Sequence, residues 1–189
     1  MGDPAKRRAT YEDLLAVPET MIAEIIDGVL HANPRPAAPH TRASSRLGIE
    51  LGGPFDTGKP GGPGGWVLLD EPELHLHGDI LVPDLAGWRR ARMPELPDAS
   101  SFELAPDWVC EVLSPGTAGT DRAEKMPIYA REGVPFAWLV DPIERTLEAY
   151  RLDAAQGRWV QHGVWRDAAR VHAEPFEVFE LELASLWAR

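Results

Sequence analysis

The stretch Trp108-Val109-Cys110-Glu111-Val112-Leu113, followed by Ser114-Pro115-Gly116, decides the fold of this chain. A short apolar run that ends in Pro and Gly is typical of a strand buried on both faces of a sheet. Its one charged residue, Glu111, lies inside the run, where a carboxylate is costly to bury unless a partner compensates its charge. The stretch therefore predicts an internal strand and singles out Glu111 as a candidate functional residue.

A second acid stands at the end of another apolar segment. Asp84 follows Ile80-Leu81-Val82-Pro83, and 27 positions separate it from Glu111 (111 − 84 = 27). This length allows an antiparallel return that lays the two acids side by side, and paired carboxylates favour a cation between them. The alternative is one salt bridge for each acid, for instance to Arg89 or Arg122. These residues alone leave both interpretations open.

A lysine follows within reach of the same strand. We predict a helix over Asp121–Arg131, which Gly133 terminates. Lys125 lies near the start of this helix and can lean back over the end of the Glu111 strand. Beside a metal-bound water, a lysine orients the water or stabilises the charge that forms during attack. The alternative is an exposed surface lysine.

The remaining pattern predicts alternating helices and strands in one domain, residues 1–189, with residues 1–9 flexible. Thr10 caps a short helix over Tyr11–Leu15, and the alternation around Asp27-Gly28 predicts a hairpin over 21–33. Apolar spacing predicts a helix over 40–51, and dense Gly and Pro predict a mobile loop over 52–65. Further strands are predicted over 66–69, 74–82, 136–140, 147–152, 158–165 and 176–183. The expected fold class is α/β, a central mixed β-sheet flanked by helices, with additional antiparallel strands near the C-terminus.

Composition restricts the partners and the location. The net charge of −11 disfavours tight non-specific binding to nucleic acid. A local basic face can still act at short range, and its candidates are Lys6, Arg7 and Arg8, then Arg89, Arg90 and Arg92; the alternative is solvated charge. One cysteine, Cys110, excludes an internal disulfide. With no secretion signal and no apolar run of about 18 residues, we expect a cytoplasmic protein without a membrane span.

Two further patterns give weaker evidence for a functional site. His75 and His77 alternate with leucines and share one predicted strand face, so they are a candidate zinc pair. Without a third ligand at a set spacing, a solvated face is the favoured interpretation. Ser114 follows the Glu111 strand but lacks the G-x-S-x-G context of a serine hydrolase.

Several motifs together resemble the Uma-two family of restriction endonucleases, over residues 10 to 183. The resemblance rests on 83–85, 110–117, 121–130, 133–135 and 138–142, and in the N-terminal part on 11–15, 24–28 and His40. This family is similar to the PD-(D/E)XK nuclease superfamily, which implies a restriction-endonuclease-like core. It also implies Mg²⁺ held by Asp84 and Glu111, with Lys125 near the attacking water. The superfamily pattern places lysine two residues after the glutamate, where this chain has Leu113, and the resemblance implies that Lys125 on the helix replaces it.

The resemblance also adds two supporting residues. Glu24 matches an N-terminal acid that could join the site, and the alternative is an acid at a strand edge. His40 matches a histidine that could contact phosphate or assist proton transfer, and the alternative is a histidine at a helix cap or core edge.

The expected function is therefore Mg²⁺-dependent endonucleolytic hydrolysis of nucleic acid, with DNA the expected substrate and Mn²⁺ able to substitute. The rival is a non-catalytic binding or assembly module that retains the fold. Acidic charge favours the rival, whereas the presence of Asp84, Glu111 and Lys125 together favours the enzyme. Strands near the C-terminus lack an evident partner in a small domain, so we also expect a homodimer.

Overall fold

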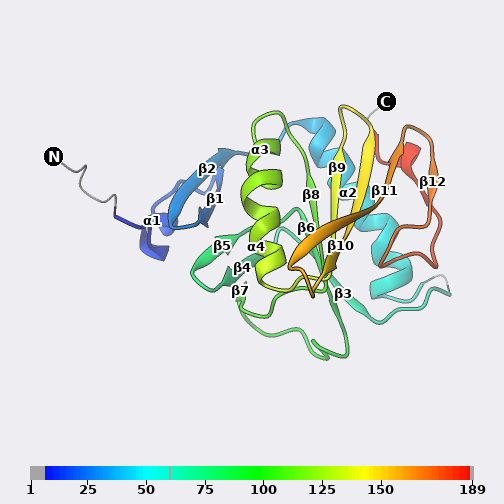
Figure 1. Cartoon of the computed structure of the whole chain (residues 1–189), viewed down its shortest axis with the longest axis horizontal. Helices are drawn as coiled ribbons and strands as arrows, with labels where there is room; N and C mark the ends of the chain where they lie inside the picture. Colours follow the sequence, from blue (N-terminus) through cyan, green and yellow to red (C-terminus); the bar gives the residue numbers. More distant parts are fainter. Residues whose placement is uncertain (1–6, 60, 188–189) are drawn as a thin grey trace.

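The apolar strand around Glu111 lies inside a six-stranded sheet (Figure 1). The structure, a computed structural model, describes residues 7–59 and 61–187. This strand is β8 (Trp108–Val112), and all its residues are buried. It pairs in parallel with β9 and antiparallel with β6, so the sheet is mixed. The strand order is β11-β10-β9-β8-β6-β3, with β3 (Trp66–Asp70), β6 (Leu85–Arg89), β9 (Phe136–Asp141), β10 (Thr146–Asp153) and β11 (Arg158–Arg166).

The N-terminal strands belong to a second, five-stranded sheet. Its order is β2-β1-β5-β4-β7, with β1 (Met21–Ile26), β2 (Val29–Pro34), β4 (Glu73–Leu76), β5 (Asp79–Leu81) and β7 (Ser101–Phe102). The hairpin β1–β2 turns at Asp27 and Gly28, whose φ angles of 50° and 80° suit an Asp-Gly turn. A short third sheet pairs β12 (Arg170–Val171) with β13 (Leu181–Glu182). The predicted α/β class is confirmed, although two larger sheets replace the single central sheet that we expected.

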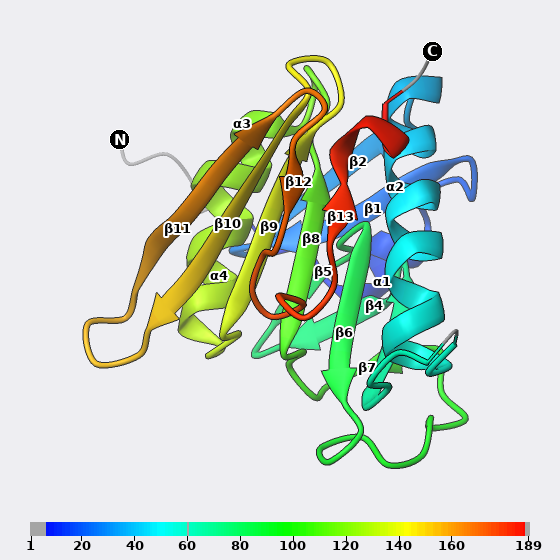
Figure 2. The ribbon, with the colours of Figure 1, turned by 90° about the vertical axis from the view of Figure 1, so that its right-hand side faces the viewer.

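Helices lie on both faces of the six-stranded sheet (Figure 2). One face carries α2 (Ala38–Leu51) and the C-terminal segment with β12 and β13, and the opposite face carries α3 (Ala118–Thr120), η2 (Asp121–Lys125) and α4 (Met126–Arg131). α1 (Tyr11–Leu15) begins with a capping box, in which the Thr10 side chain accepts from the Asp13 N–H. Within the described ranges, no helix is long and apolar enough to cross a membrane.

The predicted helix over Asp121–Arg131 forms, but η2 is a π-helical turn. Pro127 explains it, because proline has no N–H to donate to the carbonyl four residues back and its ring crowds that carbonyl. The Met126 N–H instead donates to the Asp121 carbonyl, five residues back. Such wide turns occur inside α-helices and often at functional sites.

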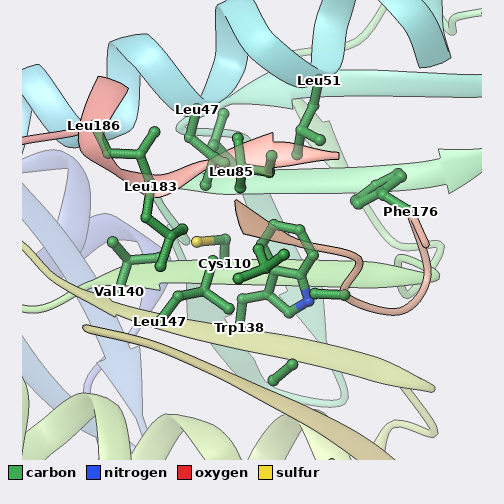
Figure 3. Packing of buried hydrophobic residues seen from close by; sticks show 14 of the residues in the cluster. Leu47, Leu51, Leu85, Cys110, Trp138, Val140, Leu147, Phe176, Leu183 and Leu186 are labelled. Atoms are coloured by element: carbon green, nitrogen blue, oxygen red, sulfur yellow. The ribbon is translucent and has the colours of Figure 1, made fainter. Parts of the chain in front are cut away.

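An apolar cluster fills the sheet face beneath α2 (Figure 3). Trp108, Cys110 and Val112 of β8 belong to it. Phe176 of the C-terminal segment lies at its centre, with ring centroids 5.0 Å from Trp108 and 4.6 Å from Phe55. The cluster also takes in Leu47 and Leu51 of α2, Trp138 of β9, Leu147 of β10, and Leu183 and Leu186 near the C-terminus. This face is therefore held mainly by apolar contacts, and the Trp138 indole N–H adds a hydrogen bond to the Glu174 carbonyl of the C-terminal segment.

Four predicted segments differ from the structure. The single strand predicted over 74–82 is wrong, because the chain turns at His77 and Gly78 and forms two antiparallel strands, β4 and β5. The loop over 52–65 is wrong for its first residues, because η1 (Gly52–Asp56) continues α2 as a π-helical turn and buries Phe55. The strand over 176–183 is wrong except for β13, because Phe176 turns inward and the chain folds back through a turn, in which the Phe179 N–H donates to the Phe176 carbonyl. Of the expected flexible segment 1–9, residues 1–6 lie outside the described residues. Arg7 pairs with Asp13, and the Ala9 N–H donates to the Gly28 carbonyl, so residues 7–9 are held in place.

Candidate functional site

The two acids that the sequence singles out lie beside each other. β6 and β8 are antiparallel with Leu85 opposite Cys110, so one step further along the register Asp84 stands opposite Glu111. Asp84 Oδ2 accepts a hydrogen bond from the Val112 N–H at 2.7 Å, which ties it to the Glu111 strand. Both acids line one cavity of about 70 Å³. The antiparallel return expected from the sequence is therefore present.

Lys125 joins this pair from the helix. Its Nζ lies 2.8 Å from Glu111 Oε1 and 2.9 Å from Glu24 Oε1, and its side chain is 3% exposed. The surface-lysine alternative is therefore wrong. Because η2 and α4 cross the face of the sheet onto which Glu111 points, the helix delivers the lysine directly to the acid.

Glu24 connects the site to the second sheet. It lies in β1, is 5% exposed, and accepts a hydrogen bond from the Val82 N–H through Oε1 at 2.8 Å. Val82 belongs to the link between β5 and Asp84. Glu24 is thus fixed by the chain segment that positions Asp84, and it lies inside the site rather than at an exposed strand edge.

His40 reaches the site from the first turn of α2. Its Nε2 lies 3.1 Å from Asp84 Oδ1, and its buried Nδ1 has no hydrogen-bond partner among the described residues. Burial lowers the pKa of His40, but the hydrogen bond and charge of Asp84 outweigh this effect and hold the pKa above its ordinary value. The structure therefore gathers all five residues selected from the sequence into one place.

Sequence reasoning missed two residues of the site. Asp121 is buried, and its Oδ1 lies 3.7 Å from Lys125 Nζ. Tyr129 is fully buried and donates from its hydroxyl to Glu111 Oε1 at 2.6 Å. Both stand four positions from Lys125, one on each side, so they share its helix face. That spacing was the signal available in the sequence.

The site has more negative than positive charge. Four carboxylates, those of Glu24, Asp84, Glu111 and Asp121, surround one lysine and one histidine in the cavity. Burial is the main reason that the pKa of Glu111 stands well above its usual range, and Lys125 opposes that shift only in part. Burial likewise raises the pKa of Asp121 to about 6. A bound cation would compensate this excess charge.

The donor set suits a hard divalent ion. Lys125 and Tyr129 both contact Oε1 of Glu111, so Oε2 is the oxygen available to a cation. No three His, Cys, Asp or Glu side chains within 7–59 and 61–187 form a ready-made ligand cluster. Mg²⁺ commonly takes only one or two carboxylates and keeps several waters. The cavity of about 70 Å³ has room for these, since one water needs about 10 to 15 Å³.

The alternative partners for the acids are engaged elsewhere. The guanidinium of Arg89 lies 4.5 Å from the centroid of the Trp66 ring, and Arg122 pairs with Glu148. Half of the six residues in the basic clusters are paired, because Arg7, Arg90 and Arg92 each contact an aspartate. Lys6 lies outside the described residues.

The minor candidates do not form sites of their own. His75 pairs with Glu73, and His77 pairs with Glu132. His77 follows the last residue of β4 and has a positive φ of 47°. Both histidines line a separate cavity of about 520 Å³, but β4 ends at Leu76, so they do not form the predicted pair on one strand. Ser114 lines the main cavity, where its hydroxyl is 3.0 Å from that of Thr117.

Comparison with known proteins first defines the class. A solved structure described as a "putative nuclease belonging to DUF820 from Anabaena variabilis ATCC 29413" is similar, with a TM-score of 0.75, 24% sequence identity and coverage of 95% of this chain and 97% of that chain. This likeness shows that the two chains share one α/β fold. The family described as "Putative restriction endonuclease" (Uma-two) matches residues 8–184, so the chain belongs to that family. No curated protein matches the sequence.

Proposed function

We propose that this protein is a divalent-metal-dependent endonuclease that hydrolyses phosphodiester bonds, with Mg²⁺ as its ion and DNA as its substrate. Mn²⁺ is expected to substitute for Mg²⁺. The single observation that carries the proposal is the buried contact of Lys125 with Glu111, itself opposite Asp84 in the register. A protein gains little stability from such a buried charged cluster, so a functional reason for it is favoured.

Asp84 and Glu111 would hold the ion, assisted by the main-chain carbonyl that follows Glu111. When bound, the ion would polarise a phosphodiester oxygen and lower the pKa of a bound water. Lys125, fixed by Glu24 and Glu111, would orient the attacking water and stabilise the negative charge that develops on the phosphate.

His40 and Glu24 would act in support. His40, whose Nε2 lies 3.1 Å from Asp84 Oδ1, would contact a phosphate oxygen or assist proton transfer to the leaving group. Glu24 would keep Lys125 charged and in place. The contact with His40 also restricts the orientation of the Asp84 carboxylate.

We also propose that the protein acts as a homodimer. β11 is an edge strand of the six-stranded sheet, and its residues between Arg158 and Arg166 carry no acidic or basic side chain other than His162. Val160 and Val164 are exposed on it. An uncovered edge of this kind favours pairing with a second copy.

Cleavage of supercoiled plasmid DNA tests the proposal. Wild-type protein should nick the plasmid in Mg²⁺ or Mn²⁺ and not in EDTA, and Glu111→Gln should abolish nicking. Glu148→Gln is the matched control, because Glu148 is another paired glutamate of low exposure that lies outside the cavity. Retained cleavage by Glu111→Gln would contradict the proposal. Binding of DNA without cleavage by the wild type would favour the non-catalytic module instead.

A further inference from the structure

Tyr129 is a buried polar side chain to which the proposed chemistry assigns no role. Its hydroxyl donates to Glu111 Oε1 at 2.6 Å, a short hydrogen bond, and its side chain is fully buried. A tyrosine phenol keeps its proton at neutral pH, so the Tyr129 hydroxyl is the donor in this contact. A neutral donor to a carboxylate restricts the orientation of that carboxylate without cancelling its charge.

The hydrogen bond selects one oxygen of Glu111. Lys125 and Tyr129 reach the acid from the same helix face, and both contact Oε1. Two contacts on one oxygen fix the side-chain torsion of the carboxylate. The other oxygen, Oε2, takes part in neither contact, so it is the one left for a ligand in the cavity that Glu111 and Asp84 both line.

We propose that Tyr129 is a positioning residue that presents Glu111 Oε2 to the divalent ion. This inference rests on the proposed metal-dependent function. In metal sites generally, partners that orient a ligand matter almost as much as the ligand, and their loss typically weakens metal binding by about 10- to 100-fold.

The chain offers a matched control for this hydrogen bond. Tyr150 donates to Glu148, another tyrosine–glutamate pair, on β10 and outside the cavity. Tyr129→Phe and Tyr150→Phe each remove one hydroxyl and keep the ring. If the Tyr129 hydroxyl is purely structural, both variants should change the stability of the fold and leave metal binding unchanged. If Tyr129 positions Glu111, only Tyr129→Phe should change metal binding.

The test is titration of Mn²⁺ into the full chain. Binding is monitored by electron paramagnetic resonance, in which the signal of free Mn²⁺ decreases as the ion binds. We expect the dissociation constant to rise by about 10- to 100-fold in Tyr129→Phe and to stay unchanged in Tyr150→Phe. Equal affinity of wild type and Tyr129→Phe would overturn the inference and leave the proposed function intact. Absence of Mn²⁺ binding by the wild type would overturn both.

If Tyr129→Phe does not fold, a second measurement on other forms of the protein tests the same inference. In the wild type, an ion on Glu111 weakens that carboxylate as an acceptor, so Mn²⁺ should change the ultraviolet absorption of Tyr129 with the same midpoint as binding. Tyr150→Phe should retain this difference spectrum. Mn²⁺ binding without any tyrosine signal in Tyr150→Phe would contradict the positioning role.

Discussion

The two faces of β8 are equally buried, and an apolar cluster packs against each of them, but only one face holds charged groups. On one face, Cys110 is fully buried among leucines and aromatic rings. On the other, the neighbouring residue Glu111 is 3% exposed and contacts Lys125 and Tyr129. Val109 and Leu113, on the same face as Glu111, belong to a second apolar cluster. Alternation along one strand thus separates a wholly apolar face from one in which charged groups are embedded in apolar packing.

This difference shows why burial alone does not locate a site. Apolar burial stabilises a fold roughly in proportion to the area removed from water. Buried charge, by contrast, has to recover a desolvation cost and is often no better for stability than apolar packing. We therefore assign the residues around Cys110 to stability and Glu111 with its charged partners to chemistry, and variants in each group should separate the two.

The largest effect is expected on the charged face. Lys125→Met should lower the turnover of DNA cleavage by about 10² to 10⁴-fold, because a positioned charge-stabilising group is lost. Mn²⁺ should still stabilise the variant, since Lys125 is no ligand. Arg122→Met, one turn away and paired with Glu148 outside the cavity, is the control. Turnover of Lys125→Met within twofold of the control would return Lys125 to a structural role.

On the apolar face, Phe176→Ala should destabilise the fold by about 3 to 5 kcal/mol. The ring packs against Phe55, Trp66, Trp108 and Trp138, and its removal leaves a cavity. The affinity of the folded protein for Mn²⁺ should not change. Urea unfolding and Mn²⁺ titration below the melting temperature measure the two quantities, and a large loss of affinity with little loss of stability would break the division between the faces.

Stability of the metal-free protein should depend on pH through Asp121. Its folded pKa of about 6 exceeds the ordinary value of 3.8, so the folded state binds its proton more tightly than the unfolded state does. The resulting stabilisation is present below about pH 4 and is lost as pH rises through about 6, by at most about 3 kcal/mol for two pKa units. Urea unfolding in EDTA should show this loss in wild type and a smaller one in Asp121→Asn. An Asp121→Asn variant less stable than wild type at pH 7 would contradict it.

The smallest expected effect is that of Cys110→Ala. Removal of the buried sulfur should cost about 1 kcal/mol, as for a cavity of methyl size, and leave cleavage unaffected. Because Cys110 is the residue before Glu111, this variant tests whether a change on one face of β8 affects catalysis on the other. A tenfold loss of turnover, measured on plasmid DNA below the melting temperature, would mean that the two faces are coupled.

Much of the site was readable in the sequence because isolated charges stand out in apolar strands. Asp84 and Glu111 could be selected in this way, and the length between them allowed the antiparallel pairing that the structure has. Asp121 and Tyr129 could not, because an acid at a helix start and an aromatic residue on a helix face are common features of ordinary helices. Only their spacing from Lys125, combined with the burial of that lysine, distinguishes them.

The fold differs from expectation where tertiary contacts override local pattern. Glycine and proline over 52–56 predicted a loop, yet Phe55 has a place in the core and draws the chain into a helical turn. Alternation over 176–183 predicted a strand, yet Phe176 packs among four other rings and prevents an extended course. The partition of the strands into two sheets also follows from long-range pairing, such as Ile25 with Ile80, which periodicity does not encode.

A Mn²⁺ soak of crystals of the wild type and of Glu111→Gln tests the central claim most directly. We predict an anomalous peak within coordination distance of Asp84 and Glu111 in the wild type, bound through Glu111 Oε2 while Lys125 and Tyr129 stay on Oε1. The peak should disappear in Glu111→Gln. No peak between these two carboxylates at millimolar Mn²⁺, or a peak that persists unchanged in Glu111→Gln, would contradict the account.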